Sequence, residues 1–135
     1  MKIYTSINET SNATYVGTVL TSNDNQLLFK NGFKLTLCDK VSAHLYGLNR
    51  TLSFIKHNDL QPENITHLLR DNIRVDIDKE MKDRIDSSEY TQRFINQYNI
   101  SINPQNSNFT EFDKDMFMTA GLEISPRTFS KDYYR

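Results

Sequence analysis

Short runs of β-branched and aromatic residues dominate the first third of the chain. They cover residues 2–6, 14–21 and 26–37, and polar stretches rich in asparagine, serine and threonine separate them. Such runs, bounded by turn-forming residues, are typical of β-strands. The pair Asn31-Gly32 interrupts the third run and fits either a hairpin turn or a bulge within one long strand. The second alternative gives an antiparallel meander of three strands.

Residues 39–56 show the clearest helical pattern. Asp39 is a typical N-cap, and Arg50 lies opposite the apolar positions on a helical wheel. The apolar positions recur at spacings of four and three: Val41, Leu45, Leu48, Leu52 and Ile55. A helix with one apolar face of this kind is predicted to lie across a sheet.

Apolar runs alternate with helical patterns in the second half. Residues 65–69 and 99–103 are predicted strands, and residues 112–120 are a predicted last helix. Residues 73–98 hold two stretches of helical spacing, although the first of them also alternates as a strand would. The order of elements predicts an α/β fold, in which helices cover a sheet with antiparallel and parallel strands.

Composition limits the class of protein. The chain has 135 residues and a net charge of −1, so any binding to nucleic acid would depend on a local patch. Cys38 is the only cysteine, which excludes an internal disulfide and favours a reducing compartment. The sequence shows no signal-peptide pattern, and no apolar run approaches the roughly 20 residues that span a bilayer. We therefore expect a cytoplasmic protein with no membrane partner.

Common catalytic motifs are absent from the sequence. With only four glycines there is no glycine-rich phosphate loop, and there is no Gly-x-Ser-x-Gly turn. Cys38, His44, His57 and His67 do not have the spacing of a zinc site, and we interpret His57 and His67 as surface or sheet-lining residues. Any chemistry would have to come from carboxylates that the fold brings together.

Several stretches resemble type 1 ribonuclease H, in the order in which that family has them. Residues 2–5 (Lys-Ile-Tyr-Thr) resemble its first strand, residues 29–33 (Phe-Lys-Asn-Gly-Phe) its third strand, and residues 43–52 its first helix. Residues 68–72 (Leu-Leu-Arg-Asp-Asn) resemble its acid-ending strand, and residues 112–121 its closing helix.

The resemblance covers residues 1–121 and leaves residues 122–135 as a C-terminal tail. It implies a ribonuclease-H-like mixed sheet covered by helices, with Gly17 in the second strand where the family often has glycine. It favours one long strand through Asn31-Gly32 over a hairpin. It also implies that the first and fourth strands pair in parallel, with the long helix as their crossover.

The family's nuclease site is built from carboxylates. Two Mg²⁺ ions are held by acids from the first strand, first helix, fourth strand and last helix. The resemblance places Ser6, His44, Asp71 and Asp113 at these positions, with Asp115 as an alternative to Asp113. Serine and histidine thus replace two acids, and imidazole suits Mn²⁺ or Zn²⁺ better than Mg²⁺. We expect the four residues to gather at one end of the sheet.

Each of these residues also has a structural interpretation. His44 flanks the apolar stripe as a half-buried histidine that bonds a neighbour would, and Ser6 ends a strand. Asp71 can cap the following helix. Asp113 or Asp115 can stabilise the N-terminus of the last helix electrostatically.

The functional expectation is a degenerate, non-catalytic ribonuclease-H-like domain that binds nucleic acid or a protein partner. It would hold no metal, or weakly bound Mg²⁺ or Mn²⁺ at Asp71 and Asp113. The first alternative is an active metal-dependent ribonuclease H that cleaves the RNA of RNA–DNA hybrids. The second is a small viral interaction protein, from a phage for example, that binds a host protein; the compact, asparagine-rich chain fits this as well. The oligomeric state stays open.

A nucleic-acid surface would need basic and aromatic side chains on one face of the domain. The sequence offers these candidates: Phe29, Lys30, Phe33, Lys34, Lys40 and Arg50.

Overall fold

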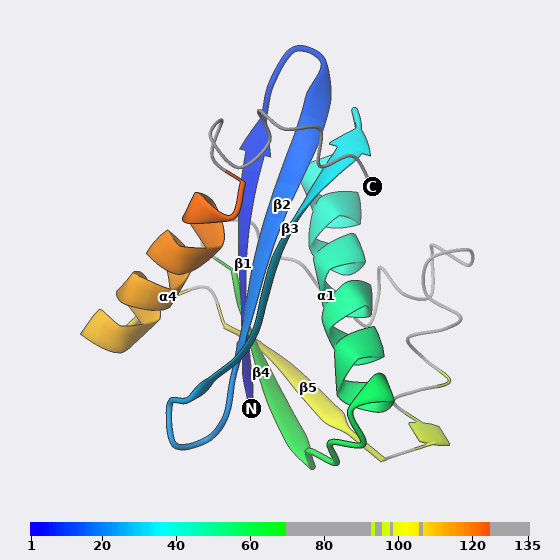
Figure 1. Ribbon diagram of the computed structural model, residues 1–135, viewed down its shortest axis with the longest axis vertical. Coiled ribbons are helices and arrows are strands. Elements are labelled where there is room, and N and C mark those ends of the chain that lie inside the picture. Colours follow the sequence, from blue (N-terminus) through cyan, green and yellow to red (C-terminus); the bar gives the residue numbers. More distant parts are fainter. Residues whose placement is uncertain (70–92, 94–95, 98, 106, 125–135) are drawn as a thin grey trace.

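A sheet with helices on both faces forms the core of the computed structural model, which describes residues 1–69, 93, 96–97, 99–105 and 107–124. Its elements are β1 (Lys2–Glu9), β2 (Ala13–Thr21), β3 (Leu27–Thr36), α1 (Lys40–His57), β4 (Asn64–Leu69), β5 (Ser101–Gln105) and α4 (Glu111–Leu122). Figure 1 shows α1 and α4 on opposite sides of the sheet. The predicted helices of residues 73–98 fall almost wholly outside the described residues.

The five described strands follow the order β3-β2-β1-β4-β5. β1 pairs antiparallel with β2, and β2 with β3, which confirms the predicted meander. β1 and β4 pair in parallel, as do β4 and β5. Asn31 and Gly32 lie inside β3, opposite Thr18 and Gly17, so the long-strand alternative is confirmed. The irregularity in this ladder lies instead at Leu20 and Thr21.

The long helix α1 begins and packs as its pattern predicts. Asp39 is the N-cap, and its side chain accepts a hydrogen bond from the Ser42 backbone N–H. Leu45, Leu48, Leu52 and Ile55 are buried and form a core cluster with residues of β1, β2 and β4. α1 is therefore the crossover that joins β3 to β4 across one face of the sheet.

The strand β1 is covered on both sides, and its side chains alternate between the helices. Ile3 packs with the apolar face of α1, and Ile7 packs near the cluster that contains Ala43 of α1. Tyr4 instead belongs to a cluster with Phe117 and Ala120 of α4. We call these two sides the α1 face and the α4 face.

The predicted last helix is longer than expected at its C-terminal end. The predicted helix covers residues 112–120, but α4 continues through Gly121 to Leu122 and Glu123 is its C-cap. No described glycine has a positive φ angle, so Gly121 does not adopt the left-handed conformation that commonly ends a helix. The last described strand likewise extends over Ser101–Gln105 rather than residues 99–103.

The C-terminal part of α4 lies against two paired glycines of the sheet. A Cβ atom built on Gly17 would lie 2.0 Å from the Ala120 carbonyl oxygen, and one on Gly32 would lie 2.2 Å from that of Glu123. Both clashes involve backbone atoms, which cannot rotate away as a side chain can. The absence of side chains at these positions therefore lets α4 approach β2 and β3 closely.

We predict that Gly17→Ala destabilises the domain by about 2 kcal/mol or more, because the added methyl group must push α4 away from the sheet. The matched control is Gly47→Ala, whose Cβ would meet only side chains, the nearest being Val16 Cγ2 at 3.2 Å. Alanine also favours a helix interior, so this control is expected to stay within about 1 kcal/mol of the wild type. Urea unfolding measures both; equal stabilities for the two variants would contradict the close backbone contact.

Candidate functional site

Asp113, at the predicted position of the last-helix acid, is buried on the α4 face. Its Oδ1 accepts a hydrogen bond from the Tyr4 hydroxyl at 2.7 Å, and Lys2 Nζ lies 3.7 Å from the same oxygen. Its Oδ2 accepts from the Thr110 backbone N–H at 2.9 Å, while its own N–H donates to Thr110 Oγ1. Asp113 thus completes a capping box and joins the start of α4 to β1.

Charge and hydrogen bonding keep Asp113 ionised. Burial by itself would raise the pKa of this carboxyl, but the hydrogen bonds from Tyr4 and Thr110 and the charge of Lys2 hold the pKa below its ordinary value. Burial and then the bond to Asp113 raise the pKa of the Tyr4 hydroxyl well above its ordinary value. Both carboxylate oxygens are therefore already bonded within the domain. The alternative acid, Asp115, is exposed on α4.

Ser6 also lies on the α4 face. It is 2% exposed, and its hydroxyl donates to the Phe117 carbonyl oxygen at 3.2 Å. This bond satisfies a polar group where the strand passes under α4. Ser6 thus bonds a backbone carbonyl one helical turn beyond Asp113.

His44 lies on the opposite face of the sheet. It is fully buried in α1, with its ring centroid 6.3 Å from that of His67 in β4. His67 Nε2 is 2.8 Å from Thr5 Oγ1, so Thr5, the neighbour of Ser6, points toward α1. Burial, and then the nearby His44, lower the pKa of His67 to about 3. The lowered pKa keeps the His67 ring neutral in this packed interior.

We expected four site residues to gather at one end of the sheet, but the structure does not bring Ser6 and His44 together. Successive side chains of a strand point to opposite faces, so Ser6 turns away from the helix that carries His44. Asp71 lies outside the described residues. Within the described part of the chain, no group of three or more His, Cys, Asp or Glu side chains could hold a metal ion. The described residues at the family's positions do not fit a pair of Mg²⁺ ions.

The hydrogen bond between His67 and Thr5 was not predicted, although His67 was interpreted as a surface or sheet-lining residue. His67 alternates with Ile65 and Leu69, both of which face the α1 core. A polar residue in register with two core residues is a signal for a buried, hydrogen-bonded side chain. This period-two pattern could have identified His67 before the structure was known.

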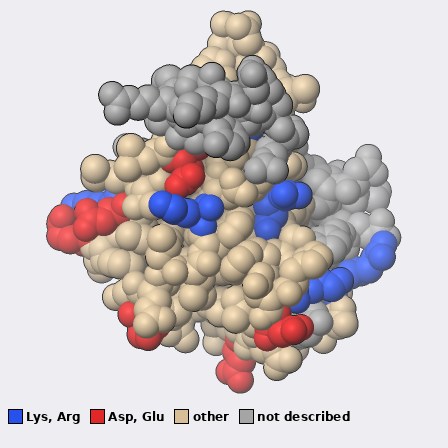
Figure 2. Space-filling view, in the orientation of Figure 1, with Lys and Arg blue, Asp and Glu red and all other residues tan. Residues whose placement is uncertain are grey.

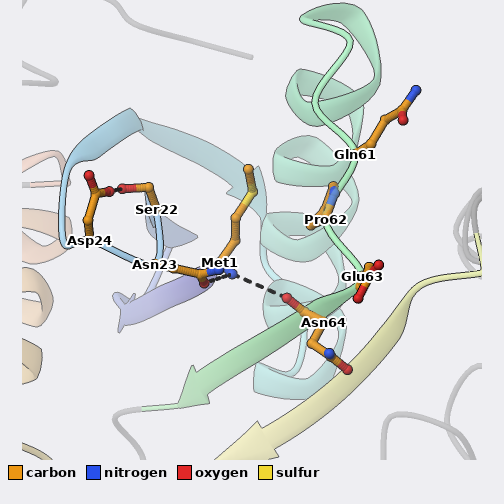
Figure 3. Close-up of a pocket in the computed structure, with 8 residues that line it drawn as sticks. All are labelled: Met1, Ser22, Asn23, Asp24, Gln61, Pro62, Glu63 and Asn64. Atoms are coloured by element: carbon orange, nitrogen blue, oxygen red, sulfur yellow. Dashed lines mark hydrogen bonds between the residues drawn. The ribbon is translucent and has the colours of Figure 1, made fainter.

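A polar hollow of about 610 Å³ lies at the beginning of β1. The Met1 ammonium group donates to Asn23 Oδ1 at 2.7 Å and to the Asn64 carbonyl oxygen at 3.2 Å, as Figure 3 shows. Asp24 and Glu63 are its two carboxylates. With its cation already bonded and two acids in its lining, this hollow is unsuited to binding an anion.

We predict that Tyr4→Phe lowers the free energy of unfolding by about 1.5–3 kcal/mol, because the buried Asp113 carboxylate loses a donor. Tyr4→Phe combined with Asp113→Asn should lower it by less than the sum of the single changes, since the two side chains share one bond. Asp115→Asn, on the exposed side of α4, is the control and should change stability by at most about 0.5 kcal/mol. Additive effects in urea unfolding would argue against the bond.

Stability should also fall in acid because of His67. Its pKa is about 3 in the folded chain against an ordinary 6.5, so between these values the unfolded chain binds a proton that the folded chain does not. His67 therefore does not reduce stability above pH 6.5, and the folded chain loses stability progressively as pH falls from 6.5 toward 3. We expect unfolding to require about 2 kcal/mol less at about pH 5 than at about pH 7.

Two variants separate this effect from other acid effects. Glutamine does not titrate, so in His67→Gln the free energy of unfolding should depend less steeply on pH, by the uptake of one proton. Thr5→Val keeps the burial but removes the hydrogen bond, so it should lower stability while retaining the slope. A wild-type pH dependence that His67→Gln leaves unchanged would show that His67 is not the titrating group.

No helix in the described ranges is long and apolar enough to cross a membrane. No protein-family model matches the chain, and no curated protein matches it.

Solved structures do match the chain. Ribonuclease H1 from the halophilic archaeon Halobacterium salinarum is 13% identical, with a TM-score of 0.62 over 91% of this chain and 96% of that one. LC11-RNase H1, solved in complex with an RNA/DNA hybrid, is 12% identical, with a TM-score of 0.62 over 91% and 95%. The protease-reverse transcriptase of prototype foamy virus is 11% identical, with a TM-score of 0.66 over 95% of this chain but 20% of that one. Such similarity establishes the architecture, and the protein therefore has the ribonuclease-H-like fold that its sequence resemblance predicted.

Proposed function

We propose that this chain is a ribonuclease-H-like domain that binds nucleic acid, in the first instance an RNA–DNA hybrid, without cleaving it. The fold supports the binding half of this proposal. LC11-RNase H1 was solved with an RNA/DNA hybrid, and a foamy viral protease-reverse transcriptase, 9% identical with a TM-score of 0.62, was solved with double-stranded DNA. The residues at the family's metal-binding positions support the second half of the proposal, which is the absence of cleavage.

The single observation that carries the non-catalytic half is the separation of Ser6 and His44 by the sheet. Two-metal hydrolysis needs hard, negatively charged ligands that converge on one point. Here Ser6 donates to a backbone carbonyl on one face, and His44 lies beside a second histidine on the other. An active nuclease would need acids from residues outside the described ranges.

The contacts of Asp113 also support the absence of metal-dependent cleavage. Its two oxygens hold Tyr4 and the backbone of Thr110, and it is 2% exposed. A metal ion at this carboxylate would have to displace bonds that fix α4 to the sheet. Asp113 is therefore best explained as a structural acid that secures the start of the helix.

The candidate basic and aromatic residues divide between the two faces. Lys30 forms an ion pair with Glu123 at 3.5 Å on the α4 face, whereas Phe29 packs against Phe54 on the α1 face. Phe33 is fully buried and so is closed to a ligand. Figure 2 shows basic side chains near the middle and at the edges of the displayed face, with an acidic side chain beside the central ones. Binding would thus depend on a local patch, as the net charge of −1 requires.

We expect the full chain to bind a fluorescent RNA–DNA hybrid in anisotropy titrations, with an affinity that falls as salt rises because phosphate contacts release counterions. The same hybrid should stay intact on a gel in Mg²⁺, with at most weak cleavage in Mn²⁺.

Two results would contradict this proposal. Absence of saturable binding to the hybrid would refute nucleic-acid binding by this route. Efficient Mg²⁺-dependent cleavage of the hybrid that Asp71→Asn abolishes would establish the active-nuclease alternative instead.

A further inference from the structure

A groove of about 340 Å³ lies between β3 and the C-terminal half of α1. Its lining comprises Phe29, Asn31, Arg50, Ser53, Phe54, His57 and Asn58. β3 is an edge strand of the described sheet, so the groove opens at the side of the domain. No acidic side chain belongs to the lining, although acidic residues are as common as basic ones in the chain.

Regular secondary structure places the groove's side chains together. Phe29 and Asn31 are two residues apart in β3, so both point to the α1 face. Arg50, Phe54 and His57 follow one another at spacings of four and three, so they share one side of α1. The groove is thus built on two regular elements rather than on loops.

Arg50 is held in position by an aromatic ring. Its guanidinium carbon lies 5.1 Å from the centroid of the Phe33 ring, and Phe33 is fully buried. Among the described residues it forms no ion pair with a carboxylate. The result is an exposed cation that is oriented by a fixed ring and has donors available for an anion.

An aromatic pair lies next to this cation. The rings of Phe29 and Phe54 stack with their centroids 4.6 Å apart and an angle of 25° between their planes, and both side chains are partly exposed. A planar ligand can extend such a stack, which is how aromatic side chains hold bases of single strands. Bases in a duplex are stacked on one another and cannot do so.

The remaining polar groups are directed by their bonds within the groove. Asn31 accepts from the Gly32 N–H through its side-chain oxygen, which leaves its amide N–H groups for a ligand. Asn58 donates to the Phe54 carbonyl, which leaves its side-chain oxygen. His57 Nδ1 donates to the Ser53 carbonyl at 2.7 Å, so its Nε2 is the free ring nitrogen.

We propose that this groove binds one nucleotide of a single strand, with the phosphate at Arg50 and the base against the Phe29–Phe54 pair. The volume falls at the lower end of small-ligand pockets, as a single nucleotide unit requires. The inference rests on the proposed function and deepens it, because it assigns single-stranded flanks of a bound nucleic acid to a surface of their own.

The test compares a blunt RNA–DNA hybrid, the same hybrid with a single-stranded overhang, and the isolated single strand, each by fluorescence anisotropy with the full chain. We expect the overhang to increase affinity about tenfold, in the range of a stacked base plus a phosphate contact. Arg50→Gln and Phe54→Leu should each remove most of this gain, so that the overhanging hybrid binds each variant about as tightly as the blunt hybrid does.

Lys56→Gln is the matched control, because it removes a positive charge from the exposed side of α1 without touching the groove lining. It should keep the overhang preference. Melting curves show whether Phe54→Leu remains folded, and Arg50→Gln, an exposed change, keeps the test valid if it does not. Arg50→Lys should restore only part of the preference if the planar guanidinium matters.

The outcomes separate the two proposals. Equal affinity for blunt and overhanging hybrids, or an overhang preference that survives Arg50→Gln, would overturn the groove and leave hybrid binding intact. Binding of the single strand alone, lost in Arg50→Gln, without binding of the blunt hybrid would support the groove and refute the hybrid as ligand. Displacement of the single strand by a glutamate-rich peptide but not by mononucleotides would assign the groove to a protein partner and overturn the proposal.

Discussion

Coverage of β1 on both faces is the constraint on which the rest of this structure depends. β1 is the middle strand of the described sheet, with β2 and β4 beside it, α1 on one face and α4 on the other. Each side chain of β1 must therefore pack against either α1 or α4. Because successive side chains alternate between the two faces, the position of a residue in the strand decides which helix it meets. Ile3 and Thr5 go to α1, and Tyr4 and Ser6 go to α4. Only odd-numbered residues of β1, such as Ile3 and Thr5, can therefore form a site together with side chains of α1.

This rule explains why the polar interior divides into two separate groups. On the α1 face, Thr5 bonds His67, and Thr18 bonds Thr51 at 2.8 Å. These are neutral partners, whose burial is tolerated because each hydroxyl finds another polar atom. On the α4 face the buried carboxylate of Asp113 is surrounded by donors. Neither group leaves an open carboxylate cluster, and both contribute to packing and helix placement.

Much of the fold could be predicted from the sequence, because periodicity reports burial directly. The α1 stripe, the meander and the parallel pairing of β1 with β4 all follow from the spacing and order of apolar residues. The face of each candidate site residue could not be predicted in the same way. Matching residue types to a family pattern aligns Ser6 with an acid position, but a strand reverses its face at every residue. A match of this kind therefore locates a residue along the chain without fixing the helix that it meets.

The groove between β3 and α1 was also beyond the reach of sequence patterns, for a different physical reason. Phe29 lies in β3 and Phe54 in α1, and only the packing of the helix on the sheet brings the two rings together. No local sequence motif contains both. Arg50 could be recognised as the residue opposite the apolar stripe, which indicates exposure but gives no orientation. Its orientation comes from Phe33, a core residue of β3 whose ring lies below the guanidinium.

A chain with a net charge of −1 can still attract phosphate at such a point, because electrostatic attraction at short range depends on the charges within about a Debye length of roughly 10 Å. A groove that holds an oriented arginine and lacks acidic lining meets this condition locally. The overall charge of the protein then limits how many phosphates it can hold, and stacking on the aromatic pair supplies attraction that salt screens little.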